Sequence, residues 1–212
     1  MKINYPNRSA LVALLALACL GACKSTKNVM SATPTAAISK RLPSLEITAD
    51  PGPLINNDGA LPDDPLRLFR AEMQRNITEP LDSATFGYAR LVVTKVHTVR
   101  TGKGLQAAQI IMLMTPSIIG IPLEWYKTDI QAEVQLLDAN GKLLGTYVGT
   151  GTSKVRVAAY HGYSQKQAPR LSDVLALRNA LSHIRPQLDT AATRLRPLLL
   201  ASGRVPAAES AR

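Results

Sequence analysis

The chain has 212 residues and a formal net charge of +10, with 25 Lys and Arg residues against 15 Asp and Glu residues. This length is sufficient for one domain with a buried core. Its two cysteines, Cys19 and Cys23, both lie near the N-terminus. Beyond residue 23 the sequence therefore excludes a disulfide framework, a zinc–thiolate site and a thiol nucleophile, and we expect the core to be held by packing alone.

The first residues have the charge and hydropathy pattern of a secretory signal. Lys2 and Arg8 make the start basic, and Ala10 to Leu20 is an uncharged apolar run. A bilayer-spanning helix needs roughly 20 apolar residues, so this run is too short to span and has the length of a signal h-region. An uncleaved anchor helix or an ordinary secretory signal is the alternative interpretation.

The run is followed by Leu20-Gly21-Ala22-Cys23, which resembles the lipobox of bacterial lipoproteins. A reading that ends at Cys19 fits less well, because Ala16 would stand where the lipobox has Leu and bulky Leu17 where a small residue is usual. The resemblance covers residues 1–23. It implies that residues 1–22 are removed and that the Cys23 thiol is acylated, with palmitate among the acyl chains.

The resemblance also implies a location. Lys24 follows the acylated cysteine, whereas in enterobacterial lipoproteins an Asp at this place retains the protein in the inner membrane. We therefore expect attachment to the outer membrane, with the domain in the periplasm. After removal of residues 1–22 from the 212, a chain of 190 residues remains.

The segment after the cysteine has no helical or strand period at first. Residues 24–40 are rich in Ser, Thr, Ala and Lys, which is typical of a flexible tether. Residues 41–61 contain several Pro and Gly residues, and a short strand is indicated only at 45–48. We predict that residues 23–60 form a lipidated, loosely attached tether.

A helix and a strand follow. Asp64 can cap a helix whose first position is Pro65, and apolar residues then recur at helical spacing up to Ile77, before Pro80. Residues 88–99 are rich in Val, Leu and Thr and apolar on both faces, which predicts a central strand.

Residues 105–121 form the most apolar run of the mature chain. A transmembrane helix is disfavoured there, because Pro116, Gly120 and Pro122 interrupt the run. One interpretation is a membrane-inserting hairpin or an oligomer contact. The other, which we favour from the sequence, is a buried strand or a short helix with a proline turn.

Three strands are predicted next. Residues 130–137 alternate between apolar and polar side chains, as in a strand with one face on the core. Asn140-Gly141 predicts a tight hairpin turn, after which residues 143–150 return as the partner strand. Gly145, Gly149 and Gly151 weaken this strand and indicate a bulge or a close approach of another backbone. Residues 154–160 are predicted to form a third antiparallel strand.

The C-terminal part is helical and basic. Residues 172–188 have an amphipathic three–four spacing, and we expect Pro186 and Pro197 to divide the helical region. From residue 151 to the end, ten basic residues are opposed by three acidic ones. Anionic envelope ligands such as phospholipid, lipopolysaccharide or acidic glycan suit such a surface, although a solvated basic face is the plain alternative. The arginines that would bind them are Arg178, Arg185, Arg194 and Arg196.

One compact polar and aromatic cluster, at residues 160–164, contains Tyr160, His161 and Tyr163. It suits a ligand-binding loop, although a turn at a strand end is the favoured interpretation. The three histidines, His97, His161 and His183, lack the spacing of metal ligands. The sequence has no Gly-x-Ser-x-Gly elbow, no His-Glu-x-x-His and no phosphate-cradling glycine loop, so we expect neither an enzyme nor a cofactor.

Together these patterns predict one α+β domain over residues 61–200 and a disordered tail over 201–212. An antiparallel sheet of about four strands would be covered by an N-terminal helix at 65–77 and a C-terminal helix at 172–188. The strands would lie near 88–99, 130–137, 143–150 and 154–160.

This layout is similar to that of small periplasmic lipoproteins that serve secretion and polysaccharide-export channels. The similarity implies a non-catalytic accessory or structural subunit of an envelope assembly, with segment 105–121 and the basic C-terminal helix as contact surfaces. Its partners would be the membrane, an envelope protein or a second copy of the chain, and not nucleic acid. A binding module for an anionic envelope ligand is the second hypothesis, and a small hydrolase around His161 is the third.

Overall fold

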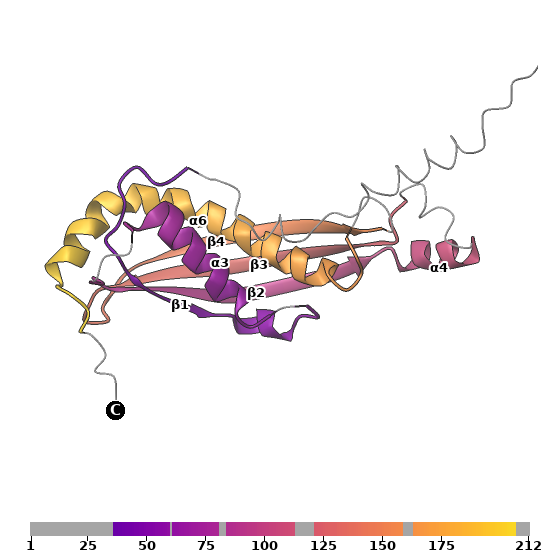
Figure 1. Cartoon of the computed structure of the whole chain (residues 1–212), viewed down its shortest axis with the longest axis horizontal. Coiled ribbons are helices and arrows are strands. Elements are labelled where there is room, and N and C mark those ends of the chain that lie inside the picture. Colours follow the sequence, from indigo (N-terminus) through magenta and orange to yellow (C-terminus); the bar gives the residue numbers. More distant parts are fainter. Residues whose placement is uncertain (1–35, 60, 81–83, 113–120, 159–162, 207–212) are drawn as a thin grey trace, which may run out of the picture.

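A computed structural model of the chain describes residues 36–59, 61–80, 84–112, 121–158 and 163–206. Figure 1 shows two layers, a long sheet and helices that cover one of its faces. In chain order the elements are β1 (Glu46–Asp50), the 3-10 helix η1 (Gly52–Asn56), α3 (Asp64–Glu72), the π-helical turn η2 (Met73–Ile77), β2 (Tyr88–Thr101), α4 (Lys103–Ile111), β3 (Glu124–Leu137), β4 (Leu143–Val157) and α6 (Ala168–Ala201).

The sheet is mixed, in the order β1-β2-β3-β4. β2, β3 and β4 are antiparallel to one another, whereas β1 runs parallel to β2 from Glu46↔Tyr88 to Asp50↔Val92. The α+β class is confirmed, and the prediction of an antiparallel sheet is wrong. The physical reason lies in the connection, because the chain returns from β1 to β2 through α3 and η2, and such a crossover places consecutive strands parallel.

The predicted helix arrangement was also incomplete. α3 and α6 lie over the same face of the sheet, and α4 is a further helix at the end of the β2–β3 hairpin (Figure 1). The segment expected to be a loose tether contributes to the core, since Leu42, Leu45 and Leu54 are buried. These three buried leucines thus hold residues 41–59 on the domain.

The face of β3 that meets the helices is the one predicted from its alternation. Ile130, Val134 and Leu136 are buried, and the intervening polar residues lie on the opposite face. The two strands expected at 143–150 and 154–160 form one continuous strand, β4. Gly149 and Gly151 therefore mark the close approach of another backbone. The pairing register between β3 and β4 shifts beside Gly145, which is where a bulge occurs.

That backbone belongs to α6. A Cβ added at Gly149 would lie 2.3 Å from the carbonyl oxygen of Ala180, and one at Gly151 would lie 2.0 Å from that of Ala176. Ala176 and Ala180 are themselves fully buried. Small residues on both elements thus let the helix lie directly on the strand, with no room for a larger side chain at either glycine.

The close contact between α6 and β4 also protects the outer edge of β4 from pairing with another strand. Asn179 Nδ2 donates to the carbonyl oxygen of Thr152 at 2.7 Å, and Gln187 Nε2 donates to that of Val148 at 2.8 Å. Between them, His183 Nδ1 lies 2.6 Å from the carbonyl oxygen of Thr150. The α6 side chains are four residues apart, a rise of about 6 Å, and the β4 carbonyls are two residues apart, a rise of about 6.6 Å. The similar spacing lets successive side chains of the helix meet successive carbonyls of the strand. Side chains of α6 occupy acceptors that a foreign strand would otherwise use.

α6 is a single helix of 34 residues that continues through Pro186 and Pro197. We expected these prolines to divide it. Both prolines are exposed, so the backbone N–H that each lacks would lie on the solvent side of the helix. A helix that wraps around a core is convex on that side, and its backbone hydrogen bonds are longest there. Figure 1 shows the C-terminal part of α6 curving over the end of the sheet.

The helix predicted at 65–77 is confirmed as α3 continued by η2, with Phe69, Met73 and Ile77 buried. Asp64 does not cap it. Its carboxylate instead accepts hydrogen bonds from Arg170 Nε at 2.7 Å and from Arg170 Nη2 at 2.8 Å, and the pair ties α3 to the start of α6.

Gly151→Ala should lower the free energy of unfolding by about 1–3 kcal/mol, because the new methyl group would overlap the backbone of α6. The midpoint of urea unfolding measures the loss. Gly104→Ala in α4 is the matched control, since a Cβ there meets nothing within 4 Å. If both variants unfold at the wild-type urea concentration, the close helix–strand contact is not as described.

Candidate functional site

The β2–β3 hairpin ends in a helix instead of a tight turn. The last residue of β2, Thr101, pairs with Trp125 at the start of β3. Gly102 follows with a φ of 103°, a left-handed value that favours glycine, and turns the chain into α4. Figure 1 shows α4 beyond the end of the sheet, away from α3. The hairpin thus carries α4 outside the two-layer core.

The apolar side chains of α4 are exposed to solvent. The exposed fraction is 63% for Ile110, 82% for Ile111 and 59% for Met112, and Leu105 and Ile121 are also exposed. Large apolar side chains gathered in one exposed patch indicate an interaction site. From the sequence we favoured burial of segment 105–121. The segment does form a short helix, but the prediction of burial is wrong for these residues. Residues 113–120 of the segment lie outside the described part.

The base of α4 is basic and aromatic on the open face of the sheet. Trp125 stands opposite Arg156, and Lys127 stands opposite Lys154 in the β3–β4 register. Lys154 Nζ lies 5.3 Å from the centre of the Trp125 ring, within cation–π range. Lys127 is exposed and pairs with Asp129 at 3.1 Å. Three cations and one tryptophan thus lie on the open face of the sheet near the base of the apolar helix. We refer to these four residues, Trp125, Lys127, Lys154 and Arg156, as the collar.

The opposite side of this base is fixed by an internal ion pair. Glu124 is fully buried and accepts a hydrogen bond from Arg100 Nε. The Arg100 guanidinium also lies 5.8 Å from the centre of the Tyr126 ring. The hydrogen bond from Arg100 to Glu124 raises the pKa of Arg100, and burial raises the pKa of Tyr126. The carboxylate of Glu124, a residue that lies against Gly102 at the start of α4, is therefore paired with a cation inside the fold.

A buried carboxyl group lies deeper between the layers. Asp173 Oδ1 accepts hydrogen bonds from Thr128 Oγ1 at 3.0 Å and from Asn57 Nδ2 at 3.2 Å. Burial raises the pKa of Asp173 to about 6, although both hydrogen bonds lower it. The adjoining cavity has a volume of about 10 Å³, the size of one water molecule. Because Asp173 is buried between the layers, its burial accounts for the raised pKa.

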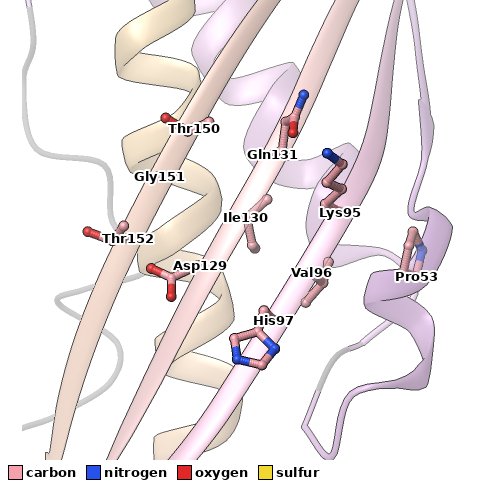
Figure 2. A pocket seen from close by; sticks show the side chains of 10 residues that line it. All are labelled: Pro53, Lys95, Val96, His97, Asp129, Ile130, Gln131, Thr150, Gly151 and Thr152. Atoms are coloured by element: carbon pink, nitrogen blue, oxygen red, sulfur yellow. The ribbon is translucent and has the colours of Figure 1, made fainter.

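A shallow hollow lies on the open face of the sheet. Its volume is about 540 Å³, and Figure 2 shows Lys95, His97, Asp129 and Gln131 on β2 and β3 along it, with Thr150 and Thr152 on β4. His97 on β2 stands opposite Asp129 on β3 in the strand register. The hollow offers a few polar groups on an open sheet face, and this is weaker evidence for a binding site than the exposed apolar side chains of α4.

Two of the four predicted arginines form ion pairs with residues of, or just after, the α3–η2 helix. Arg185 Nε donates to Glu72 Oε1 at 2.6 Å, with the Arg185 side chain 17% exposed. Arg196 Nη1 lies 2.8 Å from Glu79 Oε1 and donates to the carbonyl oxygen of Arg41 at 2.6 Å. These charges therefore stabilise the fold.

The other two predicted arginines differ from each other. Arg178 is half-buried, and burial lowers its pKa. Arg194 is exposed. A spacing of seven and then eleven residues places Arg178, Arg185 and Arg196 on one face of α6, so Arg194 projects elsewhere. The structure does not bring the four side chains together into one exposed basic surface.

Of the aromatic cluster, Tyr163 forms an isolated bridge with Val157, and its N–H donates to the carbonyl oxygen of Arg156 at 3.0 Å. This agrees with a turn at a strand end. Tyr160 and His161 lie outside the described residues, and so does the predicted acylation site Cys23.

Sequence reasoning missed the collar. The strand that contains Trp125 and Lys127 was predicted to begin at 130, because the alternation is clearest from there. The chain's single tryptophan, three residues after the proline that ends an apolar run, was the available signal.

Within the described ranges no group of three or more His, Cys, Asp or Glu side chains could hold a metal ion. None of the helices described here is both long and apolar enough to span a bilayer. The chain matches no model of a known protein family. A search of curated proteins also found no match.

The Asp173 carboxyl should make stability depend on pH. Because its native pKa of about 6 exceeds the ordinary value of 3.8, the native state binds this proton more tightly than the unfolded chain. Its stabilising contribution is therefore complete below pH 3.8 and is lost as the pH rises through 6. Relative to wild type, Asp173→Asn should gain about 2–3 kcal/mol in the free energy of unfolding between pH 4 and pH 7.

Asp189→Asn is the control with the opposite sign. The hydroxyl and N–H of Ser39 donate to Asp189 Oδ1 and lower its pKa, so this variant should lose stability relative to wild type as the pH rises. Urea unfolding across the pH range measures both. A constant difference between Asp173→Asn and wild type would contradict the buried, ionisable state of Asp173.

Proposed function

We propose that this protein is a non-catalytic, lipid-anchored accessory or structural subunit of a cell-envelope assembly for secretion, export or transport. It is held at the outer membrane by acylated Cys23, with the domain in the periplasm. The observation that supports the docking role is the exposed apolar helix α4 at the end of the β2–β3 hairpin. The anchor rests on the lipobox resemblance of residues 20–23.

Exposure of α4 to water is unfavourable. Burying apolar surface contributes roughly 25 cal/mol per Å², so covering side chains as large as Ile110 and Ile111 is worth several kcal/mol. The described core contains none of these side chains and is filled from residues 38–54, α3, η2, α6 and the sheet. An apolar helix presented in this way suits a docking surface.

The other interactions of the titratable groups support a non-catalytic role. Glu124, Asp64 and Glu72 accept hydrogen bonds from arginines, and Asp173 is enclosed. These groups link elements of the fold, so they are committed to structure rather than available to a substrate. The contacts of α6 likewise do not favour the second hypothesis, an anionic ligand bound by its arginines.

The anchor is tested by acylation. In a bacterial host that processes lipoproteins and is fed labelled palmitate, the wild-type chain should carry label and Cys23→Ser should carry none. Cys19→Ser is the matched control and should be labelled like wild type. Label retained by Cys23→Ser would overturn the proposed anchor.

The docking role is tested by cross-linking in the same cells. A photoreactive amino acid in place of Ile111 should form adducts with an identified envelope protein or membrane lipid. The same group in place of Ile55, an isoleucine of η1 that is 54% exposed, should not. Adducts at neither position, or equally at both, would contradict a docking function of α4.

A further inference from the structure

We infer that the surface which α4 docks on is the lipid bilayer itself, and that the collar binds anionic head groups. This inference rests on the proposed function in taking α4 as a docking surface, and it names the partner. It combines two features at one end of the molecule, an apolar helix outside the core and a basic, tryptophan-bearing base.

The helix has the composition that a lipid contact requires. No charged residue occurs between Lys103 and Glu124, and Glu124 is buried against Arg100. At 100° per residue, the exposed apolar positions from 105 to 112 span an arc of about 220° around the helix axis. A groove on a partner protein binds a helix through a narrow stripe of apolar side chains at positions i, i+3, i+4 and i+7. Apolar side chains on more than half of the circumference suit surrounding lipid better.

The length of α4 fixes the depth of contact. Its nine residues rise about 14 Å, which is too short to cross the hydrocarbon core of about 30 Å. A helix of this length and composition lies in the interface, with its apolar side chains reaching below the head groups. The collar then reaches the head-group level, since Trp125 is opposite the last residue of β2 and Lys127 is two residues further along β3.

The chemistry of the collar fits that level. Tryptophan favours the membrane–water interface, where its ring meets both apolar and polar surroundings. Lys127 and Lys154 are exposed, and Asp129, a carboxylate on the same strand as Lys127, is paired with Lys127. Each basic residue near an anionic surface strengthens binding about fivefold. The positive charge lies beside the apolar helix, where anionic head groups would meet it.

The tether allows both contacts at once. Ser39 hydrogen-bonds to Asp189, which lies 21 residues, or about 32 Å of helix, from the first residue of α6. That first residue, Ala168, packs with Tyr126 near the hairpin end. The 13 residues from Lys24 to Ala36 span at most about 43–47 Å when extended. The extended tether is therefore longer than the stretch of α6 that separates its attachment point at Ser39 from the hairpin end. This length allows an acyl chain on Cys23 and the helix α4 to enter the same leaflet.

The test uses residues 24–212, a chain that retains every described residue and carries no acyl group. It is floated with vesicles of phosphatidylcholine and phosphatidylglycerol at 3:1, and with vesicles of phosphatidylcholine alone. Wild type should bind the anionic vesicles, and Ile111→Asp should weaken binding at least tenfold. Ile55→Asp, the matched control, should bind like wild type, and all three should unfold at the same urea concentration because both side chains are exposed.

The basic collar has its own variant. Lys127→Gln with Lys154→Gln should weaken binding to the anionic vesicles about 25-fold and leave the weaker binding to neutral vesicles unchanged. Equal binding of wild type and Ile111→Asp, or no binding of wild type to either vesicle, would overturn the inference. If vesicles fail while Ile111 still cross-links to an envelope protein, the proposed function stands and the bilayer is not the partner. If both fail, both proposals fail.

Discussion

The structure depends on the direct contact of α6 with β4. Gly149 and Gly151 leave no side chain between the strand and the buried Ala176 and Ala180, so the two backbones approach as closely as their atoms allow. A side chain at either glycine would push the helix outward and open the core over β3 as well, because the same helix buries Leu177, Ile184 and Leu188 there. The position of α6 therefore sets the spacing of the two layers.

The same contact determines which surfaces are left for partners. Polar side chains of α6 hydrogen-bond to the outer edge of β4, which leaves that edge poorly suited to accept another strand. On the other side of α6, Arg185 pairs with Glu72 and Arg196 with Glu79, so two of the four arginines predicted to bind a ligand are committed to the fold. The hairpin end, by contrast, presents apolar and basic side chains that the core does not need.

Local patterns predicted the elements whose environment is local. The alternation of β3, the helix ending at Ile77 and the Asn140-Gly141 hairpin were all readable, because period and turn chemistry are properties of neighbouring residues. Other features depend on contacts between segments that are distant in the sequence. These are the parallel pairing of β1, the ion pairs formed by some arginines of α6 and not by others, and the exposure of Ile110. The composition of an apolar segment does not tell whether its side chains are buried or exposed. For this reason the sequence predicted burial of the residues that form α4, whereas the structure exposes them.

Trp125 allows the central claim, contact of the hairpin end with lipid, to be measured in the unmodified chain. It is the single tryptophan of the protein and it stands at the base of α4, so its fluorescence reports on this place alone. Vesicles containing phospholipids brominated at successive depths of the acyl chain should quench it most strongly at the shallowest bromines. Emission and quenching that do not change when vesicles are added would show that the hairpin end stays in water, and would contradict the account.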